Sequence, residues 1–206
     1  MSKSNRIPRQ TLVLIVVAAL GYFVDIYDLI LFNVVKKESL LALGITDPAQ
    51  IKNISISLFN WQMGGMLLGG LLWGILGDKK GRLKVLFGSI LLYSAANVFN
   101  AFVTDIPSYA LVRFIAGIGL AGELGAGITL VSEVMSKENR GYGTMIIVTF
   151  GALGAVLAAL VGGEGHAIQD VIHRVSGITL ANWQVAYIVG GVLGLMRLLL
   201  RVGTLE

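Results

Sequence analysis

The chain has 206 residues, of which 55% are hydrophobic and only 14% are charged. Soluble globular domains carry about 25% charged residues, so this composition argues against a soluble protein and favours a membrane protein. The formal net charge is +4, but the basic residues gather at the ends of apolar segments instead of on one polar face, which argues against nucleic-acid binding.

Apolar segments alternate with polar ones along the chain, and each apolar segment is long enough to cross the ~30 Å hydrocarbon core of a bilayer as a helix. The sequence therefore predicts an all-α membrane protein, in which residues 1–206 form a single bundle of six transmembrane helices. We also expect a short interfacial helix within the polar segment 164–181. The predicted spans are residues 11–35, 48–77, 84–103, 106–135, 141–163 and 182–200.

Three of the predicted boundaries rest on specific local patterns. Asp47 stands directly before Pro48, and Asp105 stands two residues before Pro107. An acidic N-cap followed by proline in the first turn is typical of a helix start. The charged run at residues 36–38 is expected to end the first span, because lysine and glutamate are costly in hydrocarbon.

The distribution of basic residues predicts the orientation of the spans. A short basic loop between two spans lies on the cytoplasmic side, which places residues 78–84 there, together with both termini and the loop 136–140. Most of the 16 basic residues then fall on that side, with Arg197 counted among those of the C-terminal segment. The sequence thus predicts an integral membrane protein with both termini in the cytoplasm, and we expect the membrane to be a bacterial inner (plasma) membrane.

Four charged residues lie well inside the apolar segments: Asp25, Asp28, Arg113 and Glu123. A charge at the bilayer centre costs at least about 2.5–3.5 kcal/mol, so such residues usually face a partner or a water-filled cavity. From their depth and helical spacing we expect Asp28 to meet Arg113, and Asp25 to share a midplane cavity with Glu123. Paired carboxylates in such a cavity suit proton uptake and release near neutral pH. The alternative is a set of internal ion pairs that only fixes helix packing.

Other polar residues give weaker signals. We expect Tyr27, Gln62 and Asn97 to form hydrogen bonds between helices, as polar residues in spans commonly do.

The chain has no cysteine, and its two histidines fall in the polar segment 164–181, so neither a metal site nor a disulfide framework is indicated. The glycine-rich runs follow no strand, and no nucleophile stands beside a base. We therefore expect no cofactor and no enzyme activity.

The segment 74–84 resembles the signature loop between the second and third helices of the major facilitator superfamily. The matching residues are Gly74, Leu76, Asp78, Lys79, Gly81 and Arg82. Leu83 departs from the pattern, and the expected basic residue follows at Lys84. The run from Arg113 to Gly119 is similar to the fourth-helix pattern of the same superfamily, and Glu133 with Arg140 is similar to its second cytoplasmic charge cluster.

Within the superfamily, residues 21–29 are similar to the first helix of proton symporters for phosphate, aromatic acids and other organic anions. The run Gly122-Glu123-Leu124 is closer to metabolite:proton symporters, because phosphate symporters carry tyrosine after the acidic residue. The resemblance implies a proton-coupled symporter of a small organic anion or metabolite, which works by alternating access. It makes Asp25, Asp28 and Glu123 proton-coupling residues, Arg113 a substrate or coupling charge, and residues 74–82 a conformational latch.

Transporters of this superfamily have twelve helices in two halves, with the substrate site between them, and the chain resembles the N-terminal half. The implied partners are the lipid bilayer, protons, a small anionic solute, and either a C-terminal six-helix half or a second copy of this chain. The sequence leaves open whether this is an isolated half or a natural half-transporter. Two alternative functions are a non-transporting half whose role is assembly, and an inorganic phosphate:proton symporter.

Overall fold

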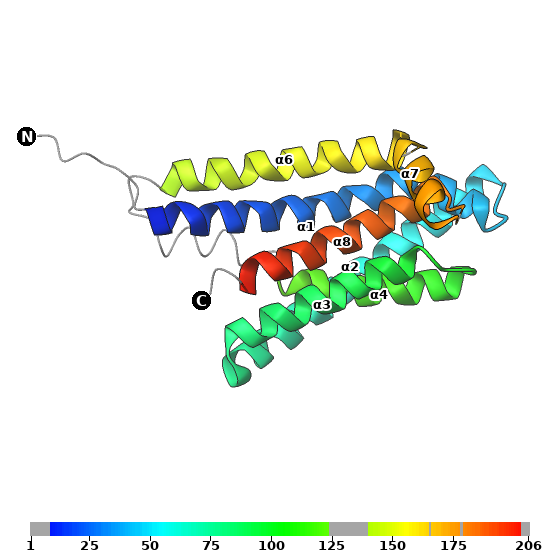
Figure 1. The fold of residues 1–206 in the computed structure, drawn as a ribbon. Helices are drawn as coiled ribbons and strands as arrows, with labels where there is room; N and C mark the ends of the chain where they lie inside the picture. Colours follow the sequence, from blue (N-terminus) through cyan, green and yellow to red (C-terminus); the bar gives the residue numbers. More distant parts are fainter. Residues whose placement is uncertain (1–8, 124–139, 165, 178, 203–206) are drawn as a thin grey trace, which may run out of the picture.

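The computed structural model describes residues 9–123, 140–164, 166–177 and 179–202. These residues form helices joined by short turns, and no strand occurs among them, which confirms the all-α class. Figure 1 shows the long helices lying side by side, with α7 set across one end. The helices are α1 (Arg9–Ala42), α2 (Pro48–Lys80), α3 (Arg82–Asn100), α4 (Ile106–Ala121), α6 (Arg140–Glu164), α7 (His166–Ser176) and α8 (Asn182–Val202).

The two helix starts expected from an acidic cap and a proline are present. Asp47 accepts hydrogen bonds from the backbone N–H groups of Ala49 and Gln50, each at 3.2 Å. Asp105 Oδ1 accepts one from Ser108 N at 2.7 Å. Each carboxylate satisfies backbone donors that the first turn of a helix leaves without a partner.

The expected end of the first helix was wrong. The charged run at residues 36–38 lies inside α1, which continues to Ala42, because lysine and glutamate are good helix formers wherever they reach water. The helix is terminated instead by Gly44, two residues beyond its end, whose φ of 86° is a left-handed conformation. Gly44 N donates to Leu41 O at 3.0 Å and Ile45 N donates to Leu40 O at 3.0 Å, the two bonds of a Schellman cap.

The expected fourth span, 106–135, also differs. Its helix α4 ends at Ala121, and Gly122 and Glu123 form a turn in which Glu123 N donates to Leu120 O at 3.1 Å. The rest of that predicted span lies outside the described residues. The short helix expected within 164–181 is present as α7.

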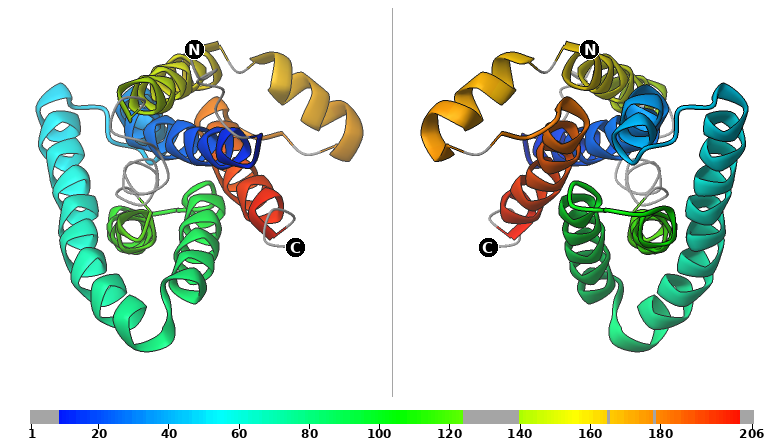
Figure 2. Two further views of the ribbon diagram at one scale, coloured as in Figure 1. Left: turned by 90° about the vertical axis from the view of Figure 1, so that its left-hand side faces the viewer. Right: turned by 90° about the vertical axis from the view of Figure 1, so that its right-hand side faces the viewer.

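The long helices pack in two groups that α3 and α8 join. Helix α1 lies against α6 and α8, α2 lies against α4, and α3 contacts both α4 and α8, as the end-on views of Figure 2 show. The α2–α4 contact depends on glycine. A Cβ on Gly65 would strike the Phe114 carbonyl, and one on Gly117 would strike the Gln62 carbonyl. Close backbone approach at small residues is the usual mode of helix packing in lipid.

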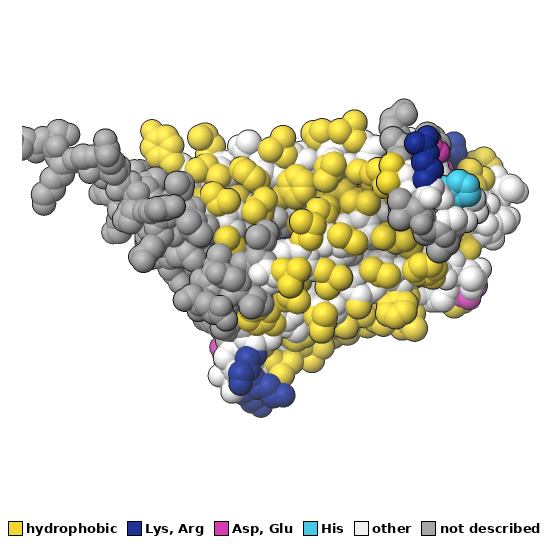
Figure 3. All heavy atoms as spheres, in the orientation of Figure 1, with side chains coloured by type: hydrophobic (Ala, Val, Ile, Leu, Met, Phe, Trp, Pro, Cys, Tyr) yellow, Lys and Arg dark blue, Asp and Glu magenta, His cyan; other side chains and the backbone are white. Residues whose placement is uncertain are grey.

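The surface and the interior have opposite characters. Hydrophobic side chains dominate the face drawn in Figure 3, and lysines and arginines appear at its ends. Leu67, Leu160 and Leu199 are among the large apolar residues that the fold leaves exposed. Two helical stretches, Ile15–Ala42 and Gly141–Gly163, are long and apolar enough by themselves to cross a membrane. Charged and polar side chains are instead found buried among the helices, which is the arrangement expected in lipid.

Candidate functional site

A buried guanidinium joins three parts of the chain. Arg197 on α8 donates through Nη1 to Asp25 Oδ1 on α1 at 2.8 Å, and through the same nitrogen to Glu123 Oε2, just after α4. The exposed fractions are 1% for Asp25, 2% for Glu123 and 7% for Arg197. We call these three residues the Arg197 cluster. Two carboxylates and one guanidinium thus lie together away from solvent.

Gly21 makes room for this cluster. It lies on α1 one turn before Asp25, and a Cβ at this position would overlap the guanidinium of Arg197. Positions i and i+4 share a face of a helix, so the same face of α1 supplies both the carboxylate and the space for its partner. Glycine at this position therefore lets the Arg197 guanidinium fit beside α1.

The sequence placed Asp25 and Glu123 in one cavity, and the structure brings the two carboxylates to the same guanidinium. It missed Arg197, which was assigned to the cytoplasmic end of the last span. That assignment was wrong, because α8 runs on to Val202 and the Arg197 side chain is buried within the bundle. One signal was available: Gly190 and Gly194 mark the helix face that packs against Tyr27 and Ser94, and Arg197 follows on that face.

A second group surrounds Asp28 and Arg113, both of which are fully buried. The expected meeting of Asp28 with Arg113 is not a direct ion pair, because no contact within 4.0 Å joins the two charged groups among the described residues. Arg113 Nη2 instead donates to Gln62 Oε1 on α2. Its guanidinium lies 4.3 Å from the centroid of the Phe32 ring, a cation–π distance.

Several polar atoms of this second group have no hydrogen-bond partner among the described residues. They are both carboxylate oxygens of Asp28, Nε and Nη1 of Arg113, and both amide atoms of Asn97. Asn97 on α3 lies close enough to the Asp28 carboxylate on α1 to interact with it between the two helices. Buried polar atoms are nearly always bonded, so this group has donors and acceptors available for a ligand or for water.

Tyrosines connect and border the two groups. The Tyr93 hydroxyl is buried within electrostatic range of Asp25, Asp28 and Glu123. Tyr27 donates to Ala186 O at 2.9 Å, which is the bond between helices expected for this residue.

Further toward the α7 end, the hydroxyl groups of Tyr109 and Tyr187 are 2.7 Å apart, and that of Tyr109 lies 3.2 Å from Ser39 Oγ. This chain of hydroxyls links α1, α4 and α8 beside Arg113 and positions the aromatic rings around its guanidinium.

The signature segment lies far from the buried charges, at the turn between α2 and α3. The expected loop is shorter than predicted, because α2 continues to Lys80 and α3 begins at Arg82, so that Gly81 alone, at φ 91°, makes the turn. Gly74, Asp78 and Lys79 are exposed residues of the last turns of α2. Glu133 lies outside the described residues, as does the side chain of Arg140, which begins α6.

Comparison with known proteins agrees with this architecture. The sequence profile of the Major Facilitator Superfamily matches residues 18–204. The chain is similar to the niacin transporter NiaP of Acinetobacter baylyi, with 35% identity over 127 residues, which cover 62% of this chain and 26% of that protein. It is also similar to the 3-(3-hydroxy-phenyl)propionate transporter of Escherichia coli, with 34% identity over 132 residues, which cover 64% of this chain and 30% of that protein.

The fold matches a solved structure over almost its whole length. This structure is a bacterial homologue of the human lysosomal transporter Spinster in an inward-facing, unoccupied conformation. The TM-score is 0.74 at 17% identity, and the match covers 97% of this chain and 44% of that one. The chain therefore spans less than half of each of these three proteins. With the profile match, the helical fold and the signature segment taken together, this chain belongs to the Major Facilitator Superfamily.

Proposed function

We propose that this chain is one six-helix half of a proton-coupled symporter for a small aromatic carboxylate. The similar proteins are named as transporters of niacin and of 3-(3-hydroxy-phenyl)propionate, and both of these compounds carry a carboxylate on an aromatic body. The observation that carries the proposal is the pair of buried charge groups, one around Arg197 and one around Arg113. Buried ionisable residues in membrane spans generally belong to substrate or proton pathways.

The Arg197 cluster fits the proton-coupling role. With Asp25 and Glu123 both ionised, two negative charges face the single positive charge of Arg197, so the cluster carries one excess negative charge. Uptake of one proton by either carboxylate makes the cluster neutral, which a low-dielectric site favours. A proton held there also changes which carboxylate Arg197 binds, and so alters the contact between α1, α8 and the end of α4.

The Arg113 group fits the anion-binding role. Its Nε and Nη1 have no hydrogen-bond partner among the described residues, so their N–H groups can donate to an anion, and a guanidinium can pair with a carboxylate in a way that the lysine ammonium cannot. The Phe32 and Tyr187 rings, with centroids 4.3 and 6.0 Å from the guanidinium carbon, offer surfaces for an aromatic body. Asp28 competes with the anion for Arg113, so protonation of Asp28 favours anion binding and couples the two.

Substrate sites in these transporters lie between two halves, so we expect a partner half, either a C-terminal six-helix unit or a second copy of this chain. The turn formed by residues 74–82 would act as a latch, with the Asp78 carboxylate near the N-terminus of a partner helix. Glu133 and Arg140 would form the neighbouring charge cluster. We expect this turn to lie on the cytoplasmic side of a bacterial inner membrane, together with both termini.

Reconstitution tests this function. The chain, alone and together with its partner half, is placed in proteoliposomes, and uptake of radiolabelled nicotinate is followed with an imposed inward proton gradient, without a gradient, and with a protonophore. Uptake that depends on the gradient supports the symporter. Uptake that is equal in all three conditions removes the proton coupling. No uptake in any condition favours a half that serves assembly, which cross-linking of the partner halves would then reveal.

A further inference from the structure

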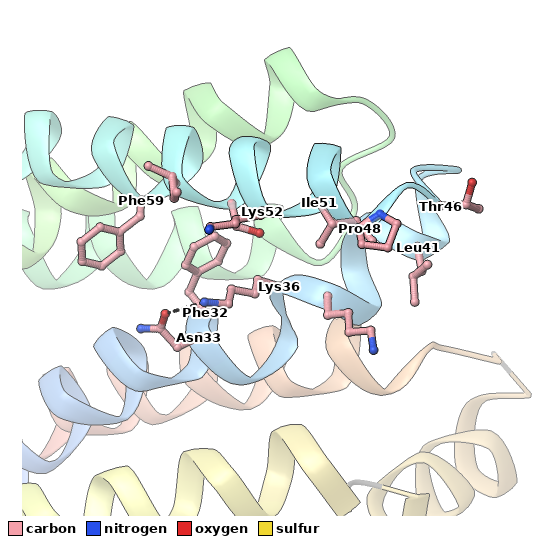
Figure 4. A pocket seen from close by; sticks show the side chains of 12 residues that line it. Phe32, Asn33, Lys36, Leu41, Thr46, Pro48, Ile51, Lys52 and Phe59 are labelled. Carbon is pink, nitrogen blue, oxygen red and sulfur yellow. Dashed lines mark hydrogen bonds between the residues drawn. The ribbon is translucent and has the colours of Figure 1, made fainter.

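A pocket of about 840 Å³ lies between the last turns of α1 and the first turns of α2, at the opposite end of α2 from the Gly81 turn. Phe32, Lys36 and Lys37 line it from α1, and Lys52, Ser55 and Phe59 line it from α2. Figure 4 shows Lys36 and Lys52 directed from their two helices into the gap that also holds the Phe32 ring.

The charge of the pocket wall has one sign. Its described lining holds three lysines and no carboxylate. Lys36 Nζ donates to Asn33 Oδ1 at 3.2 Å, a neutral partner that leaves the positive charge uncompensated. Asp47, the acidic residue just before α2, is engaged in capping the helix through Ala49 and Gln50. A concave wall with charges of one sign concentrates ions of the other sign, so the pocket attracts anions.

Ser55 supplies a second, independent indication of a ligand. Its side chain is 6% exposed, it lines the pocket, and its hydroxyl has no hydrogen-bond partner among the described residues. A serine within a helix commonly bonds to the carbonyl one turn earlier, and Ser55 does not. A buried hydroxyl in this situation is suited to bind an oxygen atom of a ligand that enters the pocket.

The aromatic lining residues and the volume of the pocket indicate which kind of ligand fits it. Phe32 and Phe59 contribute aromatic surface, and the volume falls within the range of about 300–1,000 Å³ typical of small-molecule sites. Inorganic phosphate could use the lysines but not the aromatic surface. A small aromatic carboxylate uses both, with its charged group toward the lysines and Ser55 and its ring against the phenylalanines.

One ring borders both this pocket and the central group. Phe32 lines the pocket, and the same ring lies under the Arg113 guanidinium at 4.3 Å. We propose that the pocket is a second binding site for a small aromatic carboxylate, an antechamber separated from Arg113 by the Phe32 side chain. Its place on a path to Arg113 rests on the proposed function, whereas binding in the pocket itself does not.

The test measures binding of radiolabelled nicotinate by equilibrium dialysis to the purified full chain in nanodiscs of phosphatidylcholine. Lys52→Gln should lower the affinity about threefold and Lys36→Gln/Lys52→Gln about tenfold, because each exposed charge contributes modestly and salt screens it. Ser55→Ala should lower the affinity without changing its salt dependence. Lys84→Gln is the matched control, since it removes an exposed lysine from the other end of the bundle, and it should leave the affinity unchanged.

The outcomes separate this site from the central one. Binding that the lysine variants weaken, and that Arg113→Lys preserves, supports the antechamber. Binding that only Arg113→Lys weakens overturns the antechamber and leaves the proposed function intact. The absence of saturable binding overturns the antechamber, while the uptake assay still tests the proposed function. Loss of nicotinate binding in nanodiscs of phosphatidylglycerol would identify the occupant as an anionic lipid, and this too overturns the proposal.

Discussion

Arg197 and Asp25 are separated by 172 positions in the sequence and are joined by a contact of 2.8 Å between Nη1 and Oδ1. Arg197 also holds Glu123, so the removal of this one side chain deprives two buried carboxylates of the guanidinium that they share. We expect Arg197→Met to destabilise the fold by about 3–5 kcal/mol, the usual cost of breaking a buried ion pair on one side. Thermal melting in detergent, followed by intrinsic fluorescence, measures this.

A neutral replacement of the whole Arg197 cluster provides the control for that result. The triple variant Asp25→Asn/Glu123→Gln/Arg197→Met contains no buried charge at this point and should regain most of the lost stability. If the single and triple variants melt together, the cost does not come from uncompensated charge. In either case, the triple variant should show no proton-coupled uptake.

Proton coupling should depend on Asp25 and on Glu123 separately. Replacing either by its amide leaves one carboxylate and one guanidinium, which is already a neutral pair, so the proton is no longer needed for neutrality. We expect Asp25→Asn and Glu123→Gln to abolish gradient-driven uptake while substrate exchange across the membrane continues. Gradient-driven uptake that survives in both variants would rule out the coupling role of the cluster.

Arg113 should be needed for its shape as well as its charge. Lysine retains the positive charge but cannot offer two parallel donors to a carboxylate. Arg113→Lys should therefore raise the KM for nicotinate uptake by about tenfold or more, the effect of losing about 1.4 kcal/mol. Lys84→Arg is a matched exchange of the same two residue types at an exposed position and should leave the KM unchanged. Equal KM values for the two variants would remove Arg113 from the anion site.

Replacement by alanine should change the free energy of unfolding in opposite directions at two glycines of α2. At Gly65 a Cβ would strike the Phe114 carbonyl on α4, whereas at Gly70 it would meet nothing within 4 Å. Gly65→Ala should destabilise by about 1–3 kcal/mol through overpacking. Gly70→Ala should stabilise slightly, by up to about 1 kcal/mol, because alanine favours a helix more than glycine does. Melting temperatures that shift together would contradict the close α2–α4 contact.

The latch should affect rate and not affinity. Asp78 is exposed near the end of α2 and distant from the buried charges, so Asp78→Asn should slow uptake by the assembled transporter without changing its KM. A higher KM with an unchanged maximal rate would place Asp78 at the substrate site instead.

Local patterns in the sequence predicted much of the fold. The caps at Asp47 and Asp105 act within three residues of themselves, so their helix starts could be recognised without any tertiary information. The charged run at 36–38 was expected to end the helix because charged side chains are costly in hydrocarbon. The end of α1 is instead set by Gly44 and by the two backbone hydrogen bonds that Gly44 N and Ile45 N donate. Boundaries fixed by backbone geometry are visible in sequence only through such a glycine.

The site was predictable only in part, because its contacts join distant helices. Buried carboxylates at residues 25 and 123 stand out in apolar segments, so their importance could be inferred. Arg197 could not be assigned in the same way, since counting basic residues by position treats every arginine near a helix end as exposed. The direction of a long side chain depends on which helices lie around it, and these neighbours are known only from the three-dimensional packing.

The Arg197 cluster also sets an order for membrane insertion. Chains are synthesised from the N-terminus, so α1 enters the bilayer long before α8 has been made. Asp25 must then wait in or near the hydrocarbon without the guanidinium that later holds it, at a cost of about 2.5–3.5 kcal/mol if it is charged. Helix α8 therefore supplies the ion-pair partner of α1, and Asp25 gains this partner only after residue 197 has been synthesised and inserted.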